Sequence, residues 1–249
     1  MTVYNIFMAN EEENGSSTDL FIQVLRGHIA GERQEVQPSG LSPQMTLLKQ
    51  WQVNRLKITY DDLLHHNKYK AAAEFFMTDL YGAEDFSQRD ADAENVYNTM
   101  SKYLPNRLLV TMGKAIQLNK MTQTLDTQLL ETLVHQVGMT DELTAQQYTE
   151  AYRLCDNQAV RAQQIDMVVE VGNGVANLTR IPMTGMVLRG ARRPARRGGW
   201  AELQDFLERG FAAFKQMDGV TPFLEIVSKR EYQILEQIFS GAENPFEIN

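Results

Sequence analysis

The sequence predicts an all-α protein, an irregular multi-helix bundle of about eight or nine helices. Three observations lead to this prediction. Apolar residues recur at helical spacing along most of the chain, and helix-start and helix-stop signals bracket these runs. Between turn signals, no segment alternates apolar and polar residues as a half-buried strand does.

The first third of the chain divides into a polar leader and two helical stretches. Residues 1–17 contain the run EEENGSS and predict a flexible leader, and residues 18–249 are expected to form a single all-α domain. Thr18 caps a first helix, and Ser42-Pro43 opens the next with an N-cap followed by proline at the first helical position. One helix from there to Leu80 would be about 55 Å long, so we expect a break near 65–67.

Later elements follow from their caps. Ser87 and Asp90 resemble a capping box, and the helix that they open stops before Pro105. The next helix ends at Gly138, and a second capping box starts at Thr144. Further helices are predicted over 157–180, 200–217 and 222–239. Residues 182–199 hold two prolines and four glycines, and they are the predicted hinge or subdomain boundary.

Composition and charge exclude several classes of protein. The 32 acidic and 24 basic residues give a net charge of −8, which argues against a general nucleic-acid-binding surface. A single cysteine, Cys155, allows no internal disulfide and favours a reducing, cytoplasmic location. No apolar run reaches the roughly 18–20 residues that span a bilayer, so no membrane association is expected.

The segment FFMTDLYG, residues 75–82, resembles the motif of a family of bacterial helical proteins named for Phe-Phe-Leu-Glu-Glu-Leu-Tyr. The resemblance covers roughly residues 45 to 240, and it implies an all-α fold and a bacterial origin without supplying any chemistry. Thr78 and Asp79 stand where the motif has two glutamates, which weakens a catalytic role for that pair. The residues of the motif turn are Phe75, Phe76, Asp79, Tyr81, Arg89 and Asp90. Outside the motif the resemblance rests on Trp51-Gln52, Arg55-Leu56, Tyr60, Asp62-Leu63, Tyr69, Leu104-Pro105 and Leu125-Asp126.

Metal-ligand patterns are weak. Asp62 and His65 share a helical face, but a di-iron bundle needs two Glu-x-x-His motifs and two further glutamates. The four histidines and the absence of HExxH favour solvated or capping roles, so the sequence predicts no metal site and no cofactor. If an enzyme site did lie inside the bundle, its candidates would be Asp62, His65, Glu74 and His135.

Two other catalytic patterns also fail. Cys155 is more typical of a small buried hydrophobe than of a nucleophile. Gly172 and Gly174 lack the preceding strand and the third glycine of a dinucleotide loop, so we interpret them, with Ala176, as small residues that allow close helix packing.

An arginine cluster is the strongest charge signal. Its spacing of i, i+3, i+4, i+7 and i+8 would align all five side chains on one helical face, although Pro194 would kink or end such a helix. Solvent, the chain's own acidic segment around residues 79–94, or a bound anion could balance the charge. The cluster consists of Arg189, Arg192, Arg193, Arg196 and Arg197.

Taken together, these observations favour a non-catalytic protein–protein interaction or scaffold module that binds a protein partner or self-associates. Two alternatives remain open at this point. One is a small-ligand or metal-dependent enzyme with its site inside the bundle. The other is anion or RNA binding through Arg189–Arg197, although nucleic acid is disfavoured by the net charge.

Overall fold

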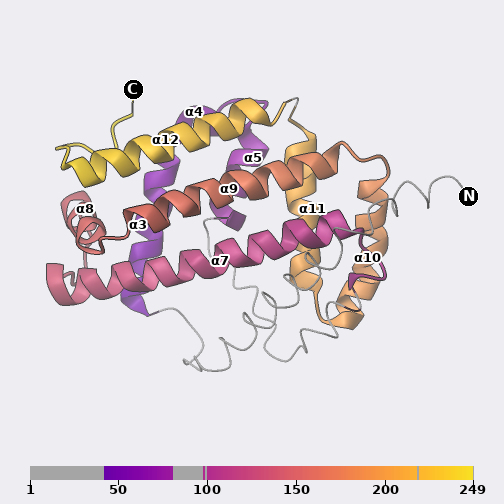
Figure 1. The fold of residues 1–249 in the computed structure, drawn as a ribbon, viewed down its shortest axis with the longest axis horizontal. Helices are drawn as coiled ribbons and strands as arrows, with labels where there is room; N and C mark the ends of the chain where they lie inside the picture. The colour runs from indigo at the N-terminus through magenta and orange to yellow at the C-terminus, as the bar shows by residue number, and fades with distance from the viewer. Residues whose placement is uncertain (1–41, 81–97, 99, 218, 249) are drawn as a thin grey trace, which may run out of the picture. The chain divides into compact units, whose positions relative to one another are not determined.

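The computed structural model describes residues 42–80, 98, 100–217 and 219–248 (Figure 1). Over these ranges it contains nine α-helices, two π-helical segments and no strand, which confirms the all-α prediction. The predicted leader, the helix after Thr18 and the helix opened by Ser87 lie outside the described residues.

The described elements are labelled along the chain in Figure 1. In order they are α3 (Pro43–Thr59), α4 (Asp61–Leu64), α5 (Lys70–Phe75), η1 (Phe76–Leu80), α7 (Asn106–Thr132), η2 (Leu133–Val137), α8 (Ala145–Leu154), α9 (Gln158–Thr179), α10 (Thr184–Gly198), α11 (Ala201–Lys215) and α12 (Thr221–Ser240). No helix among the described residues is long and apolar enough to cross a membrane.

The predicted caps form the helix ends. Ser42 accepts a hydrogen bond from the backbone N–H of Met45, and Pro43 occupies the first turn of α3. Thr144 and Gln147 bond each other's backbone in a full capping box at the start of α8. Gly138 ends η2 with φ of 78°, a conformation that glycine adopts without strain.

The break predicted after the first long helix occurs in two steps. α3 ends at Thr59, just before the almost completely buried Tyr60, and α4 ends at Leu64, just before the predicted region 65–67. The chain resumes as α5, whose last residue is Phe75. Phe75 and Phe76 are both buried, as expected of aromatic residues that pack a turn.

Residues 182–199, expected to form a hinge, are mostly helix α10. Pro194 lies inside this helix and does not end it. Proline has no backbone N–H, so the carbonyl of Gly190, four residues earlier, lacks its helical hydrogen bond. Gly190 is exposed and carries no side chain, so that carbonyl can be solvated where it lies.

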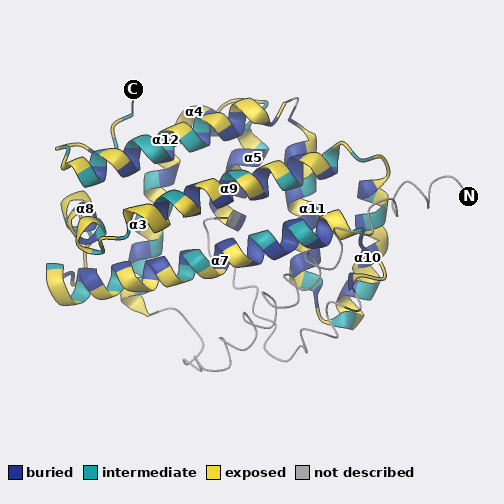
Figure 2. Cartoon of the chain, in the orientation of Figure 1, coloured by how far each residue is buried: buried dark blue, intermediate teal, exposed yellow. Residues whose placement is uncertain are grey.

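The chain divides into two compact units, and the divisions fall outside 182–199. Among the described residues, unit 1 comprises residues 98, 100–117 and 174–215, and unit 2 comprises residues 42–80, 118–173, 216–217 and 219–248. In unit 1, α10 packs against α11, and Leu188, Ala191 and Ala195 are buried on α10. Trp200, in the short connection from α10 to α11, is also buried. Figure 2 shows buried and exposed residues segregated along the helices.

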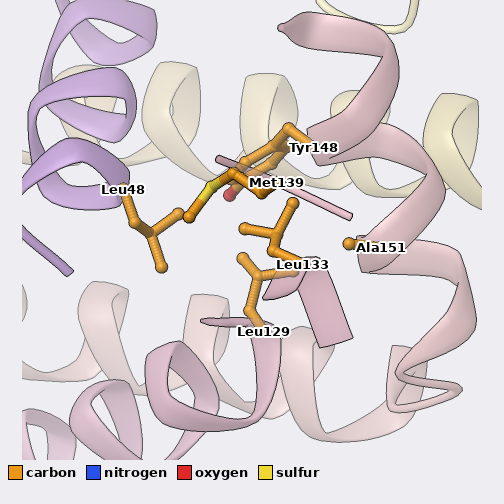
Figure 3. Packing of buried hydrophobic residues seen from close by; sticks show 6 residues of the cluster. All are labelled: Leu48, Leu129, Leu133, Met139, Tyr148 and Ala151. Carbon is orange, nitrogen blue, oxygen red and sulfur yellow. The ribbon is translucent and has the colours of Figure 1, made fainter. Parts of the chain in front are cut away.

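The core of unit 2 is apolar. Figure 3 shows Leu48 of α3, Leu129 of α7 and Leu133 of η2 beside the α8 residues Tyr148 and Ala151, with Met139 among them. Trp51 stacks on Tyr148 with ring centroids 4.0 Å apart. This cluster anchors α3, α7 and α8 to one another.

Candidate functional site

The five arginines predicted to share a face are all exposed on α10. The opposite side of the helix carries Thr184, Leu188, Ala191 and Ala195, all buried and spaced by three or four residues. This apolar stripe fixes the helix against its unit. The arginines are therefore turned to solvent by the packing of the other face.

One of the five arginines has a carboxylate partner among the described residues. The Nε of Arg192 donates to both carboxylate oxygens of Glu208 on α11, at 2.8 and 2.9 Å. Gln204 supports the same carboxylate at 2.9 Å. Hydrogen bonds from Arg192 lower the pKa of Glu208 below its usual range. The other four arginines, Arg189, Arg193, Arg196 and Arg197, form no ion pair with any residue in the described ranges.

Two exposed methionines extend this surface. Met186 is 52% exposed and lies three residues before Arg189, on the same side of α10. Met183 is 54% exposed and precedes the helix with φ of 67°, a left-handed conformation that is uncommon for a residue with a side chain. We call the surface formed by Met183, Met186, Arg189, Arg192, Arg193, Arg196 and Arg197 the arginine face.

Of the acidic segment expected to pair with these arginines, Asp79 falls within the described residues. Asp79 is buried in η1 and is hydrogen-bonded by the hydroxyl of Thr78 at 2.8 Å. The remaining carboxylates of that segment, and the motif residues Tyr81, Arg89 and Asp90, lie outside the described residues. The latch thus stays a prediction.

The residues proposed for an enzyme site inside the bundle do not converge. Glu74 and His135 are exposed. The side chain of His65 is 78% exposed, and that of Asp62 is 57% exposed and forms a two-point ion pair with Arg230 at 2.7 Å. Within the described ranges, no three metal-ligating side chains gather into a group that could hold an ion. Asp62, His65, Glu74 and His135 therefore do not form a site inside the bundle.

Unit 2 instead contains a buried cluster of ionic and polar side chains. Asp126 of α7 accepts hydrogen bonds from Lys49 at 2.5 Å and from Gln52 at 2.8 Å, both on α3. Glu231 of α12 accepts from Arg55 at 2.6 Å and from the hydroxyl of Tyr60 at 2.8 Å. Each carboxylate is at least nine-tenths buried and is matched by a basic side chain, as buried charges must be.

The third base in this cluster, Arg161 of α9, is buried, with 4% of its surface exposed. Its guanidinium donates to the backbone carbonyl of Leu125 at 3.2 Å and to the side chain of Gln164 at 3.3 Å, and it lies 4.5 Å from the centre of the Tyr152 ring. Gln164 in turn donates to Thr122 at 2.8 Å. The buried polar cluster, as we define it, comprises Lys49, Gln52, Arg55, Tyr60, Thr122, Asp126, Arg161, Gln164 and Glu231.

Sequence reasoning missed this cluster although a signal was present. Arg161 and Gln164 fall on the same helical stripe as Ile165 and Val168, and Glu231 falls four residues after Val227 on the apolar stripe of α12. A charged residue in phase with an apolar stripe must be buried with a partner. In the sequence, the only signal at four further members was the family resemblance. These are Gln52, Arg55, Tyr60 and Asp126.

Residues 32–245 match the family model described as a domain of unknown function, DUF8198. That description does not contain the motif name, so the resemblance through FFMTDLY remains a prediction. No curated protein and no solved structure matches the chain.

Proposed function

We propose that this protein, which belongs to the family of the domain of unknown function DUF8198, has a non-catalytic binding role. Its arginine face binds an acidic surface of a protein partner. The observation that carries this proposal is the composition of that face, five exposed arginines continued by two exposed methionines. Arginine and methionine are both enriched in the interfaces of proteins with other proteins.

Charge supports an acidic partner. The chain as a whole carries a net charge of −8, while the outer side of α10 concentrates five positive charges within nine residues. Such a segregated patch attracts a complementary negative surface and orients it during encounter. Arginine forks bind carboxylates in two-point geometry, as Arg192 already binds Glu208 within the unit.

A protein surface suits this face better than a nucleic acid does. Exposed methionines offer an adaptable apolar contact, which phosphate backbones do not use. The net negative charge of the chain also repels a polyanion at long range. A second copy of this acidic chain fits the same description, so self-association is one form of the proposal.

The test is the binding of a labelled peptide rich in glutamate and leucine, followed by fluorescence anisotropy at increasing salt. We expect Arg193→Glu/Arg196→Glu to weaken binding by about tenfold or more, because attraction becomes repulsion at the centre of the face. The matched control is Arg107→Glu/Arg180→Glu, which makes the same charge change at exposed positions of unit 1 outside α10.

Sedimentation of the wild type and of both double variants tests self-association in the same samples. Binding of the peptide that is equal in all three proteins would overturn the proposal. Tighter binding of a single-stranded RNA than of the acidic peptide would overturn it in favour of the nucleic-acid alternative.

A further inference from the structure

A small cavity, partly open to solvent, lies against the buried polar cluster of unit 2. It offers about 30 Å³ of space to the centre of a water molecule, enough for about two waters. Ionic and aromatic side chains share its lining with aliphatic ones from α9 and α12. The polar and aromatic part of the lining includes Gln52, Arg55, Asp126, Tyr148, Tyr152 and Arg161.

The charges around this cavity do not cancel. Lys49 neutralises Asp126 and Arg55 neutralises Glu231, so each buried acid has its own base. Arg161 has no carboxylate within ion-pair distance among the residues that the structure describes. The buried polar cluster therefore carries one net positive charge, and an isolated buried charge is costly unless a counter-ion balances it.

Donor groups at the cavity are also in excess. A guanidinium has five N–H groups, of which Arg161 uses two for Leu125 and Gln164, and its buried Nε has no acceptor in the described part of the chain. The hydroxyls of Tyr148 and Tyr152 make no hydrogen bond to a described residue either. Burial raises the pKa of both phenols, so they stay protonated as O–H donors.

We propose that this cavity binds a small monovalent anion, held by Arg161, Tyr148 and Tyr152. One negative charge balances the one unmatched guanidinium, and an anion accepts hydrogen bonds from donors that have no protein acceptor. The size of the cavity restricts the anion to chloride or to a single carboxylate group. A divalent oxyanion such as sulfate is both too large and too highly charged.

Neighbouring carboxylates do not prevent this binding. Asp126 is occupied by Lys49 and Gln52, and Glu231 by Arg55 and Tyr60, so their charges are already compensated by groups in direct contact. The ring of Tyr152 lies against the guanidinium and orients it. The site is thus assembled by the fold before an anion arrives.

The first experiment measures thermal unfolding of the full chain at constant ionic strength, with sodium gluconate replaced stepwise by chloride, formate or sulfate. Gluconate is too large for the cavity. We expect chloride or formate to raise the unfolding midpoint along a saturating curve, because binding to the folded state alone stabilises it. Sulfate should give only the unsaturable rise that it gives any folded protein. Chloride and formate curves separate an inorganic from a carboxylate ligand.

Two hydroxyl deletions supply the matched variants. Tyr152→Phe keeps the ring that orients Arg161 and removes one donor, so we expect it to weaken anion binding several-fold without unfolding the protein. Tyr232→Phe deletes a hydroxyl of the same unit that bonds Asp166 at 2.8 Å outside the cavity, and its anion dependence should equal that of the wild type.

A bromide soak of wild-type crystals gives a direct readout that needs no variant. The proposal predicts an anomalous peak beside Arg161 and Tyr152. Unfolding midpoints that do not saturate with chloride or formate, together with no bromide peak at this position, would overturn it and leave water as the occupant of the cavity.

Discussion

Arginine plays opposite parts in the two units. In unit 2, Arg161 is buried and Arg55 is partly buried. Their guanidinium groups are held by carboxylate, carbonyl, amide and aromatic partners. In unit 1, the arginines of α10 are exposed, and only Arg192 has a described carboxylate partner. The same side chain therefore serves the internal structure of one unit and the outer surface of the other.

The position of an arginine on its helix, and not the residue type, therefore decides whether it serves internal structure or the surface. Arg161 falls on the apolar stripe of α9, so folding removes it from water and a partner becomes obligatory. The arginines of α10 fall opposite the apolar stripe, so folding leaves them hydrated and costs little. Removing a partner in unit 2 should consequently cause a large loss in the free energy of unfolding. Charge changes on α10 should affect binding more than stability.

The largest effect is expected from Glu231→Ala. It leaves the partly buried Arg55 guanidinium without this carboxylate, and it removes the nearer acceptor of the Tyr60 hydroxyl. We expect a loss of about 3–5 kcal/mol in the free energy of unfolding, measured by urea denaturation. The double variant Arg55→Met/Glu231→Leu removes both charges and should recover most of this loss. A single variant as stable as the wild type would show that the pair is not buried in solution.

Gly172→Ala tests the packing that positions the buried arginines. A Cβ at this position of α9 would lie 2.6 Å from a methyl group of Leu224 on α12, so one of the two helices or the leucine must shift. The gain in helix propensity offsets part of the strain, and we expect a net loss of about 1 kcal/mol in urea denaturation. Stabilisation by this substitution would indicate that α9 and α12 are less closely packed than described.

Gly190→Ala is the matching substitution on α10 and should have the opposite sign. A Cβ there meets nothing within 4 Å, and the position is exposed within a helix. We expect stabilisation by about 0.5–1 kcal/mol, because alanine favours the helix and loses less backbone entropy on folding. A higher unfolding midpoint checks this expectation, whereas a lower one would mean that residue 190 contacts a part of the chain outside the described ranges.

The ion pair of Asp62 with Arg230 is an intermediate case, partly exposed but well aligned. Hydrogen bonding from Arg230 lowers the pKa of Asp62, so the pair stabilises the folded state above the unfolded pKa of about 3.9 and loses that contribution as the pH falls through the folded value. With Asp62 more than half exposed, Asp62→Asn should cost less than about 1 kcal/mol at pH 7. The difference from wild type should shrink below about pH 4, and a difference that grows on acidification would contradict the assignment.

Local signals in the sequence were sufficient for the secondary structure. Ser42-Pro43, Gly138 and the Thr144 capping box act through neighbouring residues, so their roles could be predicted without the fold. Pro194 does not end α10, although proline commonly ends a helix. The placement of the five arginines on one helix follows from their spacing, whereas their exposure depends on the packing of the opposite face.

The buried polar cluster could not be predicted in the same way. Its partners are distant in sequence, for example Arg55 and Glu231, which are separated by 176 residues. Helical periodicity places each one on an inward stripe, but only the packing of α3 against α12 and of α7 against α9 decides which charges meet. The metal candidates Asp62 and His65 were chosen by spacing alone, and tertiary packing left both at the surface.

The most direct test of the account is the free energy of unfolding of Arg193→Glu/Arg196→Glu, measured in urea beside the wild type. This variant avoids Arg192, whose pairing with Glu208 would confuse the result. If the arginine face serves recognition, stability should change by no more than about 1 kcal/mol, as for other exposed substitutions. A loss of several kcal/mol would contradict the account, because the arginines would then hold the chain's own acidic segment as an internal latch.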